Sequence, residues 1–117
     1  MLRVLVVDDE PRVGRLVASV IEEAGHEVAT ALNGAEAMSL SATTRFNVVV
    51  SDVQMPFMSG IQLARELSGR GDSPRIILMS GNLEVLRRAK NLPCVAGVLE
   101  KPMTAGAILH LLKEVVP

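Results

Sequence analysis

Short apolar segments alternate with amphipathic segments of helical spacing along the whole chain, and this alternation constrains the fold more than any other feature. The first apolar segment, Leu2–Val7, is interrupted only by Arg3, which is typical of a central parallel strand buried on both faces. Parallel strands need crossover connections, and the amphipathic segments supply helical ones. The pattern predicts an open α/β sandwich of five βα units. The predicted strands are Leu2–Val7, Glu27–Ala31, Val48–Ser51, Arg75–Met79 and Val95–Glu100.

The predicted helices carry recognisable start and stop signals. The first opens at Asp9-Glu10-Pro11, with Asp9 as its candidate N-cap, and ends before Gly25 in the C′ position. Thr104 is predicted to cap the last helix, which extends to about Val116. The other predicted helices are Ala35–Ala42 after an Asn33-Gly34 turn, Ile61–Ser68, and Asn82–Asn91. The second strand, Glu27–Ala31, is the more polar one and is expected near an edge of the sheet.

Composition favours one domain and excludes several classes of protein. With 117 residues, 49% of them hydrophobic, the chain is expected to form one domain over residues 1–117. A net charge of −1 with interspersed signs predicts no nucleic-acid or membrane binding. The one cysteine, Cys94, allows no intrachain disulfide and is expected to be a small buried residue. No signal peptide or membrane-spanning run is recognisable, so a cytoplasmic location is expected.

Polar residues stand at the ends of four of the predicted strands. They are Asp8-Asp9, Asp52, Ser80-Gly81 and Lys101-Pro102. Because parallel strands point the same way, their carboxyl ends meet at one edge of the sheet, where these side chains should converge. Carboxylates that crowd together repel one another, and a hard cation such as Mg²⁺ resolves that repulsion. The mixture of carboxylates, a hydroxyl and an ammonium therefore favours a site for a divalent cation and a phosphoryl group.

Each polar group also has a purely structural interpretation. Asp8-Asp9 could cap a helix, Asp52 could begin a loop, and Ser80 could begin a turn. Lys101 alone would be read as a solvated charge. The acidic groups at two central strand ends of one sheet, taken together, favour the functional interpretation.

The motifs in their order along the chain resemble the receiver domain of bacterial two-component response regulators, which are CheY-like. The matching residues are Val6-Val7-Asp8-Asp9-Glu10, Ser51-Asp52 followed by Gln54-Met55-Pro56, Met58 and Gly60, then Met79-Ser80-Gly81 and Lys101-Pro102. The resemblance covers essentially the whole chain. It implies a flavodoxin-like (βα)5 three-layer sandwich with a parallel sheet of strand order 2-1-3-4-5.

The resemblance also implies roles for the polar residues. Asp52 would be the phosphoacceptor, and Ser80 and Lys101 would contact the phosphoryl group, with a cis bond between Lys101 and Pro102. Mg²⁺ would be bound by Asp52, by the backbone carbonyl of Gln54, and by Asp9 together with Asp8 through water. The donor would be a phosphohistidine on a sensor histidine kinase or phosphotransfer protein. Apart from its own phosphorylation and slow dephosphorylation, such a chain is a signalling protein and not an enzyme.

Three positions of the resemblance predict how this chain differs in behaviour. The family tunes hydrolysis two residues beyond the acceptor and two beyond the hydroxyl; here these are Gln54 and Asn82, neither of which is an acid or a base. Three residues before Lys101, where the family often has an aromatic switch residue, stands Val98. Valine is stiff at χ1 and has no ring to move. The phosphorylated form is therefore expected to differ only modestly from the free form.

Other interpretations remain open from the residues. A haloacid-dehalogenase-type phosphohydrolase needs a second Asp where Gln54 stands, and no Gly-x-Gly-x-x-Gly motif follows the first strand to indicate a dinucleotide-binding domain. A pseudo-receiver that only binds partners is a third alternative. The chain is a free-standing receiver, a receiver from a longer regulator, or part of a hybrid kinase. Extra apolar residues on the last helix, chiefly Leu111 and Val116, extend the core or form a homodimer or output surface with Asn82–Asn91 and Val95–Glu100.

Overall fold

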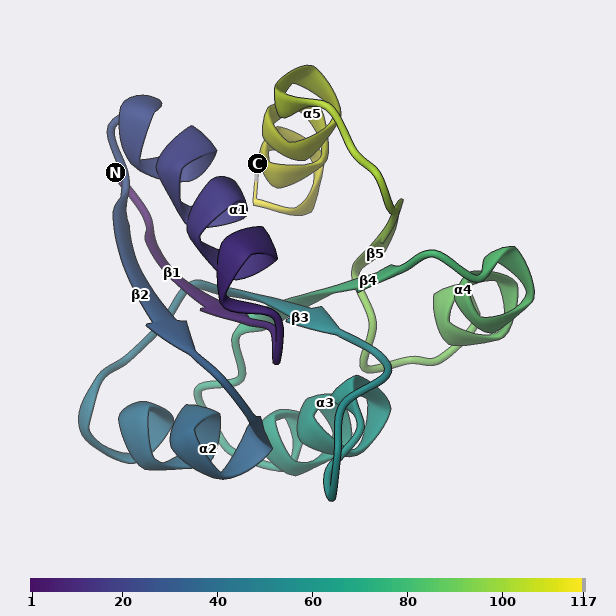
Figure 1. Cartoon of the computed structure of the whole chain (residues 1–117). Helices are drawn as coiled ribbons and strands as arrows, with labels where there is room; N and C mark the ends of the chain where they lie inside the picture. Colours follow the sequence, from purple (N-terminus) through teal and green to yellow (C-terminus); the bar gives the residue numbers. More distant parts are fainter. Residues whose placement is uncertain (117) are drawn as a thin grey trace.

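The computed structural model describes residues 1–116 and contains a five-stranded parallel sheet in the order β2-β1-β3-β4-β5. The predicted strand order and sandwich architecture are confirmed (Figure 1). Strand pairing brings Val7 beside Ser51, and Asp52 beside Met79, so that the carboxyl ends of the strands lie level. The elements are β1 (Arg3–Val7), α1 (Pro11–Glu23), β2 (Glu27–Ala31), α2 (Gly34–Thr43), β3 (Val48–Asp52), α3 (Gly60–Ser68), β4 (Arg75–Ser80), α4 (Leu83–Lys90), β5 (Gly97–Glu100) and α5 (Ala105–Val115).

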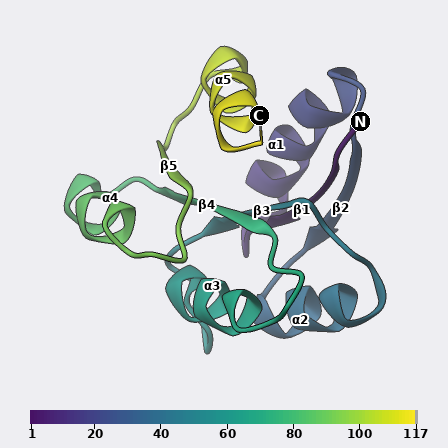
Figure 2. The same ribbon diagram turned by 180° about the vertical axis from the view of Figure 1, so that it is seen from behind.

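Helices cover both faces of the sheet, and successive strand residues contribute to opposite layers. In β1, Val4 and Val6 pack with α1 and α5, whereas Leu5 and Val7 pack with α2, α3 and α4. Figures 1 and 2 show α1 and α5 together on one side, and α2 and α3 on the other. Because side chains alternate along a strand, a strand buried on both faces must be apolar throughout, which explains the continuous apolar run of β1.

Strand boundaries differ from the sequence-based prediction at the carboxyl ends and in β5. Asp52 and Ser80 are the last residues of β3 and β4, one position later than predicted. β5 begins at Gly97 instead of Val95, because the Val95 N–H donates to Leu92 O and closes a turn. Hydropathy could not distinguish Val95 from a strand residue, since its side chain still packs against the core.

Helix starts also differ in part. The prediction that Asp9 caps α1 is wrong: Glu10 is the N-cap and makes no side-chain capping bond, while Pro11 starts the helix as predicted. Gly25 has a φ of 99°, which confirms its left-handed position after the helix, and Thr104 caps α5 as predicted. α2 begins at Gly34, one residue before its predicted start, and Asn33 is its N-cap. α4 begins at Leu83, one residue after its predicted start, because Asn82 is its N-cap.

The predictions for the single cysteine and for α5 have mixed outcomes. Cys94 is half-buried, less than predicted, and packs beside the layer of α2, α3 and α4. Leu111 and Val116 are half-buried against the core cluster of α1 and α5, so their apolar character extends the core. No helix within residues 1–116 is long and apolar enough to cross a bilayer.

Candidate acidic site at the carboxyl edge of the sheet

The fold brings the predicted polar residues to one edge of the sheet. Asp8 follows β1 directly, Asp52 and Ser80 end β3 and β4, and Lys101 follows β5. Backbone bonds lock this edge: the Lys101 N–H donates to Ser80 O at 2.9 Å. The convergence follows from strand parallelism, because groups far apart in sequence stand at equivalent ends of adjacent strands.

Asp8 and Lys101 form a partly buried ion pair at the centre of the site. Lys101 Nζ lies 2.9 Å from Asp8 Oδ2 and 3.3 Å from Asp52 Oδ1. The Asp8 side chain is 0% exposed, and its Oδ1 accepts the backbone N–H of Glu10 at 2.9 Å. The ion pair and this hydrogen bond together fix the Asp8 side chain. The hydrogen bond also ties Asp8 to Glu10, the N-cap of α1.

Asp8, Asp9 and Asp52 form a carboxylate cluster. One oxygen from each lies within 4.8 Å of the others, and Asp9 alone of the three is exposed. Three carboxylates against one ammonium leave an excess of two negative charges at the site. A divalent cation with oxygen preference matches both this charge and this donor set.

The ionisation of Asp52 and Lys101 reflects their burial and their proximity. Burial raises the pKa of Asp52 above its usual range, the Lys101 ammonium opposes that shift, and the carboxylate of Asp8 adds to it. Burial lowers the pKa of Lys101, but its bonds and attraction to Asp8 and Asp52 more than offset this, and the pKa is raised. Lys101 is therefore a permanent cation beside Asp52.

Ser80 and Gln54 are the remaining predicted site residues. Ser80 is 1% exposed, and its Oγ accepts the Asn82 N–H at 3.0 Å. The Asn82 side chain in turn caps α4 through the N–H groups of Glu84 and Val85. Among the described residues no side-chain hydrogen bond joins Ser80 to the carboxylates, although its own hydroxyl proton is still available to donate. The Gln54 side chain is exposed on the loop after β3.

Sequence reasoning included Gly60 in the motif but did not predict how it shapes the loop after Asp52. Gly60 approaches the end of β3 so closely that a Cβ there would lie 2.3 Å from Asp52 O. The Gly60 N–H donates to Val53 O at 2.9 Å and closes the loop, while the Ser51 hydroxyl donates to Asp52 O at 2.9 Å. The glycine after Met58-Ser59 was a visible signal, but the approach that requires it arises only when α3 packs against β3.

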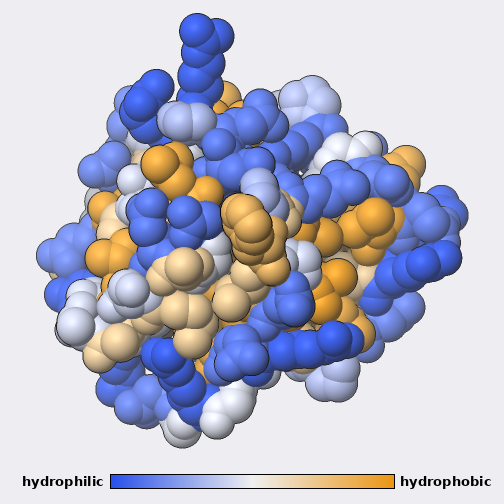
Figure 3. All heavy atoms as spheres, turned by 60° about the horizontal axis from the view of Figure 1, so that its bottom comes forward, coloured by the Kyte–Doolittle hydropathy of each residue, from blue (hydrophilic) through white to orange (hydrophobic). Residues whose placement is uncertain are grey.

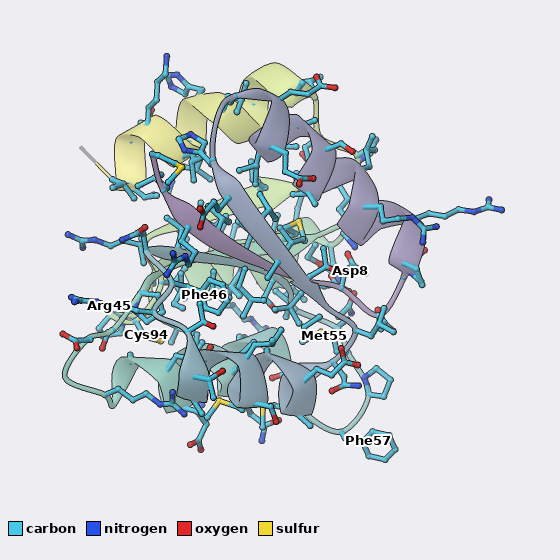
Figure 4. All side chains as sticks on the ribbon, turned by 90° about the vertical axis from the view of Figure 1, so that its left-hand side faces the viewer. Asp8, Arg45, Phe46, Met55, Phe57 and Cys94 are labelled. Carbon is cyan, nitrogen blue, oxygen red and sulfur yellow. The ribbon has the colours of Figure 1, made fainter. Side chains whose placement is uncertain are left out.

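The same loop places an aromatic residue near the acidic edge. Figure 4 shows Asp8, Met55 and Phe57 on the same side of the molecule, with the Phe57 ring directed outward from the loop. Arg45 and Cys94 lie toward the opposite side. The loop that follows Asp52 therefore forms part of the rim of the site.

Comparison with known proteins agrees with this geometry. The chain matches the family model described as the response regulator receiver domain over residues 4–113. A response regulator receiver protein of Anaeromyxobacter sp. is 34% identical over 113 residues, which cover 95% of this chain and 47% of that protein. The response regulator MprA of Mycobacterium tuberculosis is 32% identical over 109 residues, covering 92% of this chain and 47% of that protein. The chain thus spans about half the length of the curated relatives it matches.

Solved structures show the same architecture. The chemotaxis response regulator CheY4 of Vibrio cholerae superimposes with a TM-score of 0.89 at 30% identity, covering 99% of both chains. The response regulator TrrA of Thermotoga maritima, solved in complex with Mg²⁺ and BeF, gives a TM-score of 0.87 at 28% identity, covering 99% of this chain and 100% of that one.

Proposed function

This chain belongs to the family of response regulator receiver domains, and from this membership we propose that Asp52 accepts a phosphoryl group in a two-component phosphorelay. One observation carries the proposal: Lys101 Nζ lies 3.3 Å from Asp52 Oδ1 while Asp8 holds it at 2.9 Å. A fixed cation next to a buried carboxylate is what a nucleophile needs when it receives a negatively charged group. We propose for the other site residues the roles that the family resemblance implies.

The proposed donor is a phosphohistidine on a sensor histidine kinase or a phosphotransfer protein. An ionised Asp52 oxygen attacks the phosphorus, and the bond between phosphorus and the imidazole nitrogen breaks. The nitrogen keeps the bonding electron pair and takes a proton from solvent, and Asp52 becomes an acyl phosphate. Lys101 stabilises the charge on the phosphoryl oxygens, and the Ser80 hydroxyl donates a hydrogen bond to one of them.

Asp52, Asp9, Asp8 through water, and the backbone carbonyl of Gln54 are the proposed Mg²⁺ ligands. The excess negative charge of the carboxylate cluster fits that ion. When bound, Mg²⁺ supplies charge neutralisation and orientation for the phosphoryl oxygens. The Mg²⁺ and BeF complex of the structural neighbour TrrA supports this proposal.

Labelling with a small phosphodonor tests the assignment. Acetyl phosphate with Mg²⁺ should add one phosphoryl group to the chain, measured by intact mass, and the Asp52→Asn variant should not be labelled. Asp72→Asn serves as the control, because Asp72 is an exposed partner of Arg45 far from the site. Labelling that persists in Asp52→Asn, or that is unaffected by removal of Mg²⁺ with a chelator, would contradict the proposal.

The fate of the phosphoryl group follows from the same residues. Gln54 and Asn82 offer no acid or base to a hydrolytic water, and the Asn82 side chain is already used to cap α4. Slow dephosphorylation is therefore part of the proposal. We further propose that residues 1–117 act as one receiver domain and that the surface of α4, β5 and α5 contacts an output partner or a second copy.

A further inference from the structure

Large apolar side chains that remain exposed are concentrated around the acidic site. Apart from Met1 at the N-terminus, the strongly exposed examples among residues 1–116 are Leu16, Leu32, Phe57 and Leu83. Leu32 follows β2, Leu83 begins α4 after β4, and Leu16 lines a cavity of about 350 Å³ with Lys101. Single exposed apolar residues are ordinary, but several of them on elements that border one polar site call for an explanation.

Phe57 is the extreme member of this group. Its exposure reaches 106%, so the ring makes no packing contribution to the folded chain. Its φ is 67°, and it is the one non-glycine residue within 1–116 with a positive φ. The Met58 N–H donates to Pro56 O at 2.7 Å across it, which makes Phe57 the centre of a strained γ-turn. A bulky residue is disfavoured in this conformation.

Neither the local backbone nor the core accounts for Phe57. Glycine or asparagine would suit its φ better, and a polar side chain would suit its exposure better. Backbone strain of this kind is concentrated at functional sites, where other interactions offset its energetic cost. The contact that Phe57 makes is therefore to be sought outside this chain.

The position of the turn beside Asp52 indicates which kind of molecule contacts Phe57. The loop is closed at its base by the bond from Gly60 N–H to Val53 O, directly after Asp52. Three residues span at most about 11 Å, so Phe57 stands within that reach of the loop base beside the acceptor. A protein that brings phosphorus into bonding distance of Asp52 must therefore cover this rim. Figure 3, in which the α2 and α3 side comes forward, shows apolar atoms gathered across the middle of that face within a hydrophilic surround.

We propose that Phe57 is an anchor for the phosphohistidine donor protein, inserting its ring into an apolar pocket of that protein during transfer to Asp52. This inference rests on the proposed function of Asp52. Aromatic side chains are enriched in the buried centres of interfaces, and truncation of an anchor residue weakens binding strongly. Leu32 and Leu83 would then line the same contact, and a small phosphodonor would not depend on Phe57.

Two donors and two substitutions test this inference. Asp52 labelling is measured with acetyl phosphate, and with the member of a panel of autophosphorylated histidine kinases that labels the unsubstituted chain fastest. Phe57→Asn suits the backbone and removes the ring, whereas Phe57→Leu keeps an apolar side chain. We expect Phe57→Asn to lower kcat/KM for the kinase at least about ten-fold, mainly through KM, with labelling by acetyl phosphate unchanged within about two-fold.

The controls separate docking from folding and chemistry. Phe57→Leu should keep kinase kcat/KM within about three-fold, and Phe57→Asn should unfold at a urea concentration no lower than the unsubstituted chain, since its backbone strain is relieved. An unchanged kinase rate in Phe57→Asn, or an equal loss with both donors, would overturn the anchor role. The anchor role would also be overturned if acetyl phosphate labels Asp52 but no kinase of the panel does. If neither donor labels Asp52, the proposed function itself fails and the anchor role with it.

Discussion

Asp52 is the residue at which stability and function conflict most directly. Its side chain is 9% exposed, and burial is the main cause of its raised pKa. Since its folded-state pKa lies above that of an unfolded aspartate, protonation favours the folded chain. The contribution of Asp52 to stability is therefore fully present below the unfolded pKa and is lost as the pH rises through the folded pKa. At neutral pH the ionised acceptor destabilises the metal-free chain.

Asp52→Asn should consequently increase the free energy of unfolding at pH 7 in the presence of a chelator. The advantage over the unsubstituted chain should disappear as the pH falls through the folded pKa of Asp52, because both side chains are then neutral. Urea denaturation across a pH series measures this difference. Asp72→Asn is the matched control and should change stability by less than about 0.5 kcal/mol. If Asp52→Asn is less stable than the unsubstituted chain at pH 7, or if its gain in stability does not depend on pH, then the ionised Asp52 carboxylate does not destabilise the folded chain.

The adjacent acids Asp8 and Asp9 show how far single residues could be assigned from sequence. Both were placed in the acidic site, and both contribute an oxygen to the carboxylate cluster. Their unequal burial was not predicted: Asp8 is buried against Lys101 and bonded to Glu10 N–H, and Asp9 is exposed and caps nothing. Which of two neighbouring carboxylates turns inward depends on how α1 leaves the sheet, which local sequence does not encode.

At the level of elements, the junction of β3 and α3 fixes the geometry of the acceptor. Ser59 and Gln62 form a capping box that starts α3, and Gly60 lies against the last residue of β3. The neighbouring atoms at Gly60 are backbone atoms of Asp52 and Val53, which cannot move aside as a flexible side chain would. The helix can approach the strand this closely only because Gly60 has no side chain.

Gly60→Ala should therefore lower the free energy of unfolding by about 3 kcal/mol, at the upper end of the usual effect of overpacking. It should also slow labelling by acetyl phosphate, since the loop after Asp52 must shift. Gly71→Ala is the control, because a Cβ at Gly71 would meet nothing within 4 Å, and its effect should stay within about 0.5 kcal/mol. Chemical denaturation measures the free energy of unfolding of both variants. Equal values for the two would show that the junction of β3 and α3 tolerates a side chain at position 60.

On the scale of the whole molecule, the proposed route from the site to the surface passes through an edge strand. β5 is the last strand of the sheet, and Val98 within it is half-buried against the core cluster of α2, α3 and α4. Its short branched side chain is stiff at χ1 and has no ring to move between two positions. Moving a population from 1:99 to 99:1 needs about 5.5 kcal/mol of differential stabilisation, which has to come from loops and α4 alone.

Phosphorylation is accordingly expected to produce only modest backbone changes in β5 and α5. Amide NMR spectra of the free chain and of the chain held phosphorylated with acetyl phosphate and Mg²⁺ measure this. Shifts should be large at the loops after β1, β3, β4 and β5, where Asp8, Asp52, Ser80 and Lys101 lie, and small within β5 and α5 themselves. The Asp52→Asn variant under the same conditions controls for Mg²⁺ and acetyl phosphate alone. Large shifts throughout β5 and α5 would show that the switch does not need an aromatic residue at position 98.

The sequence by itself determined the number and order of the elements, the parallel sheet and the set of polar groups at its edge. These follow from periodicity and turn residues, which act over a few neighbouring positions. Only the tertiary structure decided that Asp8 holds Lys101, that Val95 closes a turn, and that Gly60 must lack a side chain. The same holds for Phe57, whose full exposure and left-handed backbone no pattern predicted. These features depend on groups that are distant along the chain or on how a loop closes, so they exist only once the layers have packed.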